Sequence, residues 1–174
     1  MRWSKSKLQG FTLIELLIAI GVMVTVSTIA LTILTVILRS SEKANLMLQL
    51  KQNGNAALSQ MVDAIRYAKS LDSPASCMPS VTLTPPSLTI TSLQDNGQTT
   101  YACSANTISS NSASLIDTNA FTVSSCSFVC SQSSADTPPT ITIQFTLQTK
   151  TQNNFVETTA SLPFESAVTL RNVQ

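Results

Sequence analysis

Residues 16–38 form an unbroken run without a charged side chain, and this run most constrains how the chain can fold. At about 1.5 Å per residue, its 23 residues make a helix of about 35 Å, longer than the roughly 30 Å hydrocarbon core of a bilayer. A buried helix of a soluble domain is the alternative, but that helix would be shorter and would keep a polar face. The run therefore predicts a transmembrane helix, which we place over residues 11–38.

A cleaved secretory signal is the stronger alternative, because its apolar region of about 7–15 residues ends at a small-residue cleavage site. Here the apolar run continues to Leu38, well past Ala30, so we expect the segment to remain as an anchor. The ten residues before it form a leader that holds three bases and no acid, namely Arg2, Lys5 and Lys7. The positive-inside rule then places the N-terminus in the cytoplasm and everything after residue 39 outside, as in a single-pass inner-membrane protein.

Glu15 is the only charged residue in the predicted span. A carboxylate at mid-membrane costs about 2.5–3.5 kcal/mol on insertion scales, so such a residue is a functional candidate. Cleavage just before Phe11 would create a partner, the new α-amine. At about 4 Å and an effective dielectric constant near 20, their attraction is about 4 kcal/mol. The alternative is that Glu15 reaches the cytoplasmic interface and plays no part in assembly.

The segment around Glu15 carries a resemblance to a known family. Residues 7–20 read Lys-Leu-Gln-Gly-Phe-Thr-Leu-Ile-Glu-Leu-Leu-Ile-Ala-Ile and resemble the class III signal of type IV prepilins and type II secretion pseudopilins. The resemblance implies cleavage between Gly10 and Phe11 by prepilin peptidase and N-methylation of Phe11. It also implies that Glu15 pairs with the Phe11 amine of a neighbouring subunit. The implied partners are the peptidase, other pilin or pseudopilin subunits, the inner-membrane assembly platform and the lipid bilayer.

Residues 39–71 predict an amphipathic extension of the same helix, because no proline interrupts residues 11–73. An apolar stripe recurs every three or four residues, at Met47, Leu50, Gly54, Leu58, Met61, Ile65 and Ala68. The opposite side carries polar residues, namely Lys51, Asn55, Gln60, Asp63 and Arg66. We expect the stripe to pack on the chain's own head, which does not exclude helix packing in a filament.

Residues 52–68 resemble the corresponding helix of W-type minor pilins and J-type pseudopilins. Many major pilins carry a proline about twenty residues into the mature helix, whereas the first proline here is Pro74. Both features favour a minor pilin or a pseudopilin.

Residues 72–174 predict a Ser/Thr-rich β head, so that the whole chain is of the α+β class: a long N-terminal helix packed on an antiparallel sheet. Asp95-Asn-Gly predicts a hairpin turn between strands at 87–93 and 99–103. Residues 140–148 alternate, with Ile141, Ile143, Phe145 and Leu147 on one face. Further strands are predicted at 121–130, at 155–162 after a turn at 151–154, and at 167–170.

Four cysteines, at Cys77, Cys103, Cys126 and Cys130, all follow the apolar run. Their even number on the exported side predicts disulfides, with three connectivities possible. Free buried thiols and a metal site are the alternatives. We expect no metal, because only one pair is closely spaced and the chain has no histidine to complete a site.

The composition of the head argues against an enzyme and against a nucleic-acid-binding protein. Without histidine, a Ser-His-Asp arrangement is impossible, and we expect no enzyme activity and no cofactor. Asp95 and Asn96 suit a hairpin turn better than a calcium site. The head has two bases, Lys150 and Arg171, against six acids, so we do not expect nucleic acid as a direct ligand.

The sequence thus predicts a structural subunit of a pilus-like or type II secretion filament. The alternative is a bitopic surface adhesin or receptor that is anchored by the same helix and does not assemble. The residues do not distinguish a pilus, a secretion filament and a DNA-uptake machine.

Overall fold

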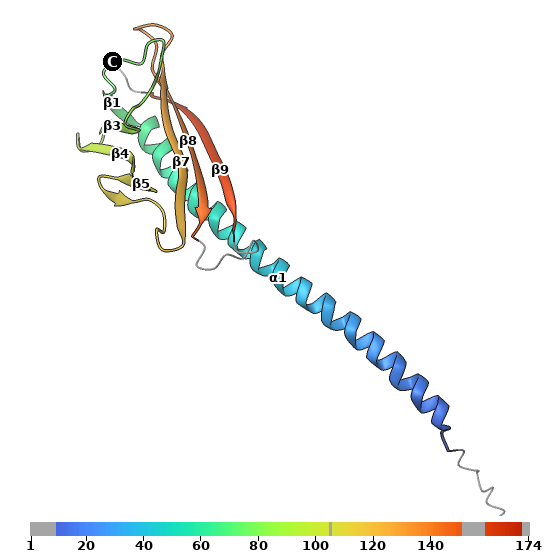
Figure 1. The fold of residues 1–174 in the computed structure, drawn as a ribbon. Helices are drawn as coiled ribbons and strands as arrows, with labels where there is room; N and C mark the ends of the chain where they lie inside the picture. The colour runs from blue at the N-terminus through green and yellow to red at the C-terminus, as the bar shows by residue number, and fades with distance from the viewer. Residues whose placement is uncertain (1–9, 105, 151–158, 172–174) are drawn as a thin grey trace, which may run out of the picture. The chain divides into compact units, whose positions relative to one another are not determined.

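The structure is a computed structural model that describes residues 10–104, 106–150 and 159–171. The chain divides into two compact units, one ending at Glu42 and one starting at Lys43, and the long helix α1 contributes to both. Along the chain the elements are α1 (Leu13–Arg66), β1 (Ala68–Ser73), β2 (Ser80–Thr82), β3 (Ser87–Ser92), β4 (Gln98–Ser104), β5 (Thr107–Ser110), β6 (Ala113–Ser114), β7 (Phe121–Ser131), β8 (Thr140–Thr149) and β9 (Ser161–Thr169) (Figure 1).

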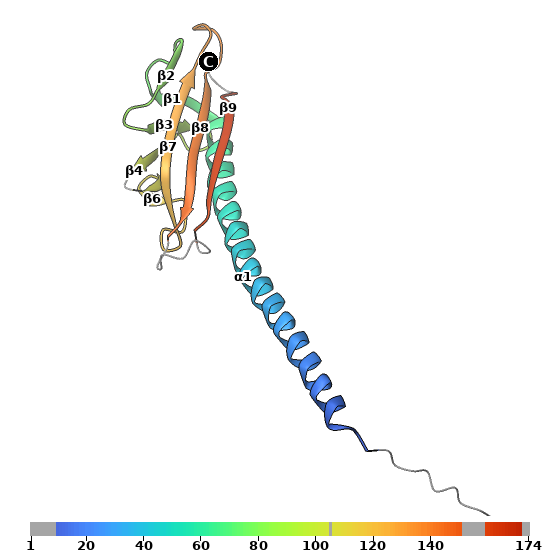
Figure 2. The ribbon, with the colours of Figure 1, turned by 45° about the vertical axis from the view of Figure 1, so that its right-hand side comes forward.

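The predicted α+β class is confirmed, but the head contains two antiparallel sheets where we expected one. The first sheet has the order β1-β3-β4-β5-β6 and the second β2-β7-β8-β9. The first sheet ends in a tight reversal at Asn111 and Ser112, whose φ angles are positive (48° and 72°). This turn joins β5 to β6; after β6 the chain leaves the first sheet, and β7 pairs with β2 and β8 instead. Figure 2 shows β7, β8 and β9 side by side along the part of α1 that belongs to the head.

Helix α1 ends at Arg66, five residues before the predicted end at residue 71. Ala68 to Ser73 form strand β1, which pairs with β3. Three side chains donate hydrogen bonds to the Asp72 carboxylate: Thr91 at 2.6 Å, Ser70 at 3.0 Å and Gln98 at 3.2 Å. Pairing with β3 satisfies the backbone N–H and C=O groups of this segment. These hydrogen bonds stabilise the segment more than one further turn of α1 would.

The predicted hairpin is confirmed as β3 and β4 with Asp95-Asn-Gly at the turn. The carboxylate of Asp95 accepts the backbone N–H of Gly97 at 3.0 Å, and Asn96 has a φ of 52°. The hydrogen bond from the Ser92 side chain, and after it that from Gly97, lower the pKa of Asp95. The Asp95 carboxylate therefore stabilises the hairpin turn.

Strands β7 and β8 match their predicted positions, and the four alternating residues of β8 are all buried. Strand β9 is one strand from Ser161 to Thr169, which corrects the prediction of separate strands at 155–162 and 167–170. Because β9 pairs with β8 without a register shift, one continuous ladder covers this whole segment. The predicted turn at 151–154 and residues 155–158 lie outside the described residues.

One face of α1 supplies the helix side of the head's core. Buried on this face are Leu50, Gly54, Ala57, Met61 and Ile65. The predicted stripe is therefore largely correct. It differs in that Ala57 is buried where we predicted Leu58, which is half-buried, and in that Met47 is exposed. The polar side of the helix is exposed as predicted. The core residues from the helix and from both sheets form one continuous cluster.

The closest approach between helix and sheet occurs at Gly54. A Cβ atom built on Gly54 would lie 2.0 Å from Cζ of Phe164 in β9, so the ring occupies the place of a side chain. The Phe164 ring is itself stacked on Phe145 of β8, with centroids 5.1 Å apart. Because the stacked ring cannot withdraw freely, the helix needs a residue without a Cβ here.

We predict that Gly54→Leu destabilises the head by about 1 kcal/mol. Overpacking costs about 1–3 kcal/mol, and leucine recovers at most about 1 kcal/mol through helix propensity. The measurement is urea unfolding of the full chain in detergent micelles, followed by far-ultraviolet circular dichroism. Gly21→Leu is the matched control, since no atom lies within 4 Å of the Cβ position there. An unchanged unfolding midpoint for Gly54→Leu would contradict the close approach.

Candidate processing and assembly site

The start of α1 is fixed by Thr12. The backbone N–H of Glu15 lies 3.3 Å from the Thr12 hydroxyl oxygen and 3.1 Å from the Thr12 carbonyl oxygen. The N–H of Leu16 also donates to this carbonyl. These contacts make Thr12 the N-cap of the helix. Sequence reasoning missed this role, although Thr12-Leu-Ile-Glu15 has the spacing of a capping box and would have revealed it.

Gly10 and Phe11 therefore lie just before the helix begins. Both residues are exposed, and the Phe11 side chain is 84% accessible. No atom lies within 4 Å of the position that a Cβ on Gly10 would occupy. Within the N-terminal unit, the peptide bond between these two residues is open to an enzyme and is not held in helical hydrogen bonds.

Glu15 lies in the first turn of α1 and is exposed. Across the part of the chain that the structure describes, its carboxylate has neither a hydrogen bond nor an ion pair. A negative charge in the first turn is favoured by the helix dipole, typically by about 0.3–1 kcal/mol. The site thus combines an accessible peptide bond, a helix start and an unpaired carboxylate within six residues. The three leader bases, Arg2, Lys5 and Lys7, lie outside the described residues.

The helix behind this site exposes its apolar side chains on every side. From Leu13 to Leu38, the large apolar residues are between 52% and 77% accessible. This part of α1 is long and apolar enough to cross a membrane. Its hydroxyl side chains donate to carbonyls three or four residues earlier, and so need no water: Thr25, Ser27, Thr28, Thr32 and Thr35.

In the head, the four cysteines form two disulfides, Cys77–Cys130 and Cys103–Cys126. This is one of the three connectivities that the sequence left open. Cys126 and Cys130 are close in sequence, but they lie on one face of β7, about 13 Å apart at about 3.3 Å per residue. A disulfide requires Cα atoms within about 7 Å, so each cysteine pairs with another segment.

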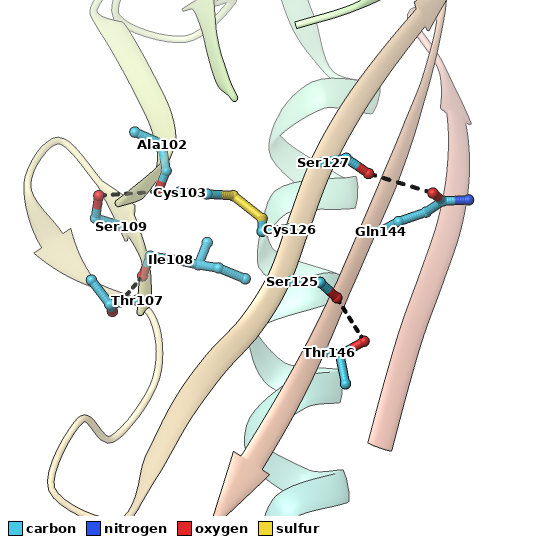
Figure 3. Close-up of a disulfide and its surroundings, with 10 residues drawn as sticks. All are labelled: Ala102, Cys103, Thr107, Ile108, Ser109, Ser125, Cys126, Ser127, Gln144 and Thr146. Atoms are coloured by element: carbon cyan, nitrogen blue, oxygen red, sulfur yellow. Dashed lines mark hydrogen bonds between the residues drawn. A yellow bond between two sulfur atoms is a disulfide. The ribbon is translucent and has the colours of Figure 1, made fainter. Parts of the chain in front are cut away.

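The second disulfide joins the two sheets of the head. Cys103 lies at the end of β4 in the first sheet and Cys126 in β7 of the second (Figure 3). On the other side of β7, side chains of β7 and β8 pair with each other, Ser125 with Thr146 and Ser127 with Gln144 (Figure 3). Gln144 in turn donates to Glu165 of β9 at 2.9 Å. The hydroxyls and amides of this sheet face are therefore bonded to one another.

Comparisons of the chain with protein-family models, with curated proteins and with solved structures found no match.

We predict that Thr12→Val loosens the first turn of α1 by about 1 kcal/mol, because the hydroxyl that caps the Glu15 N–H is lost. In detergent micelles, amide hydrogen exchange of Glu15 and Leu16 should then accelerate about fivefold. Thr12→Ser keeps the hydroxyl and should exchange like the parent chain. Equal exchange rates in the valine and serine variants would show that the hydroxyl does not stabilise the helix start.

Proposed function

We propose that this chain is a structural subunit, a minor pilin or pseudopilin, of a type IV pilus-like or type II secretion filament. Its leader is removed after Gly10 by prepilin peptidase, and Phe11 becomes the N-methylated first residue. The observation that carries the proposal is the contiguous motif of residues 7–20, which places a cut site before an apolar helix with one acid in its first turn. Residues 52–68, through their resemblance to W-type and J-type subunits, favour a minor role.

The apolar surface of α1 supports assembly. Between Leu13 and Leu38 the helix has no buried residue. Burial of such surface yields about 25 cal/mol per Å², so it must be covered by something outside the described chain. A bilayer covers it in the precursor. In a filament, the same surface packs against the helices of other subunits, which the assembly platform transfers from the membrane.

The geometry of the first turn of α1 supports cleavage of the leader and a fixed axial register between neighbouring subunits. The bond between Gly10 and Phe11 lies outside the helix, where a peptidase can bind it in an extended form. Its cleavage leaves an α-amine on Phe11. The Glu15 carboxylate has no partner among the described residues and is available to this amine on a neighbouring subunit. At about 4 Å such a pair is worth about 4 kcal/mol at an effective dielectric constant near 20, which offsets the cost of placing Glu15 in the membrane.

Mass spectrometry of the N-terminus tests the proposal directly. We expect N-methylated Phe11 on chains isolated from cells that express prepilin peptidase, and unprocessed chains from cells that lack it. Gly10→Leu should prevent cleavage, because a leucine side chain obstructs the close approach of the enzyme to the scissile bond. Gly21→Leu makes the same substitution inside the helix and should be cut normally.

The alternative, a membrane-anchored adhesin or receptor that does not assemble, predicts a different N-terminus. An intact Met1, or a cut near residue 30, would refute the filament proposal and support this alternative. Normal processing of Gly10→Leu would refute the assignment of the cut site alone.

We predict that Glu15→Val inserts and is cut like the parent chain but enters filaments at least about tenfold less. Loss of a pair worth about 4 kcal/mol exceeds the tenfold equivalent of 1.4 kcal/mol even after solvent screening. The measurement is the amount of subunit in sheared filaments relative to the membrane. Glu42→Val, which removes a carboxylate beyond the apolar run, is the control and should assemble normally. Normal incorporation of Glu15→Val would exclude the charge pair.

A further inference from the structure

The two disulfides of the head differ sharply in burial. Cys77 and Cys130 are 2% and 0% accessible and belong to the core. Cys103 and Cys126 are half-buried and lie at the edge of the same cluster. Thiol–disulfide exchange requires a thiolate to reach a sulfur atom directly, so access separates the two bonds.

A cleft lies beside the more exposed bond. It has a volume of about 210 Å³ and is lined by both cysteines of the pair. Its rim is polar and carries no charge, being formed mainly by Ser104, Asn106, Thr107 and Ser124. A water molecule takes about 30 Å³ in the liquid, so the cleft can hold the sulfur of an incoming thiolate with several waters. Neither Cys77 nor Cys130 lines this cleft.

The Cys103–Cys126 bond also joins parts of the head that share few other polar contacts near it among the described residues. Near it, the carbonyl of Asn106, just before β5, accepts the N–H of Val123 in β7 at 2.8 Å. A register shift in β7 follows directly, between Val123 and Ser125. By contrast, Cys77–Cys130 fastens a loop onto β7, where β2 already pairs through Val81 and Cys130. Opening Cys103–Cys126 therefore removes a covalent link between sheets and leaves each ladder and the shared core intact.

We propose that Cys103–Cys126 is the site at which the folded head exchanges with a dithiol protein of the Cys-x-x-Cys class, while Cys77–Cys130 is protected. In the reducing direction, one thiolate of the dithiol attacks a sulfur of the pair. The bond between Cys103 and Cys126 breaks, a mixed disulfide forms, and the released cysteine thiolate takes up a proton. The second thiol of the partner then loses its proton and attacks the mixed disulfide, which releases the other cysteine. Two electrons and two protons pass to the head, and the partner becomes a disulfide.

The same steps in reverse form the bond. Cys103–Cys126 can therefore be closed or reopened after the head has folded around Cys77–Cys130. This exchange is independent of whether the chain assembles into a filament.

The test uses the full chain in detergent micelles with dithiothreitol as the first probe. Samples are quenched with acid at intervals, alkylated and digested, and each cysteine is quantified by mass spectrometry. We expect Cys103 and Cys126 to be alkylated at least about tenfold faster than Cys77 and Cys130. In guanidinium chloride, where the head is unfolded, this difference should disappear. Equal rates under native conditions, or faster opening of the buried pair, would overturn the proposal.

The second probe is a Cys-x-x-Cys protein whose second cysteine is changed to serine, so that the mixed disulfide is trapped. We expect adducts at Cys103 or Cys126, and no adduct in the double variant Cys103→Ser, Cys126→Ser. The double variant Cys77→Ser, Cys130→Ser keeps the exposed bond and should form the adduct like the parent. If either variant fails to fold, the position of the adduct in the parent chain decides between the two disulfides. An adduct at Cys77 or Cys130, or none at all, would refute this partner class.

Discussion

The packing of one face of α1 against residues of both sheets holds the head together. Leu50, Met61 and Ile65 are fully buried on this face, and they belong to the same cluster as the inner residues of β3, β4 and β8. The approach is closest where Gly54 meets the Phe164 ring. Because the helix face is common to both sheets, neither sheet has a complete core without it. The Cys103–Cys126 bond adds a covalent link to a junction that is already formed by burial.

The same helix changes character along its length. Up to Leu38 its apolar residues are exposed on all sides, whereas from Leu50 onward they form a single buried stripe. The first pattern requires an apolar environment outside the chain, and the second finds its environment in the head. Covalent continuity within one helix therefore joins an apolar segment that could span a membrane to the packed head. The proposed subunit requires such a link, because it would first be held in a membrane and later be packed among other helices.

The sequence predicted those features that depend on local periodicity. The alternation of Ile141, Ile143 and Phe145 identified strand β8 with one buried face, and Asp95-Asn-Gly identified the turn of the separate hairpin β3–β4. The predicted end of α1 was wrong. The local sequence from Ala68 to Leu71 is compatible with a helix, but pairing with β3 makes it a strand. The second sheet and the disulfide partners could not be predicted from the sequence for the same reason, since both depend on which distant strands become neighbours. Thr12 carried a recognisable local signal and was missed only because Glu15 was considered for its charge alone.

The N-cap at Thr12 links the proposed cut to the proposed assembly. The N-cap lies one residue after Phe11, so the amine that the proposed cleavage creates would lie before the helix, outside its hydrogen bonds, and could contact another chain. Glu15 is held in the first turn, where the helix dipole favours a negative charge by up to about 1 kcal/mol. A charge at mid-membrane costs about 2.5–3.5 kcal/mol, and the place of Glu15 in the first turn lowers that cost, so the proposed precursor can tolerate the residue. In the proposed filament, the amine of a cut neighbouring chain pairs with Glu15, and an uncut subunit would lack the interaction that sets its register.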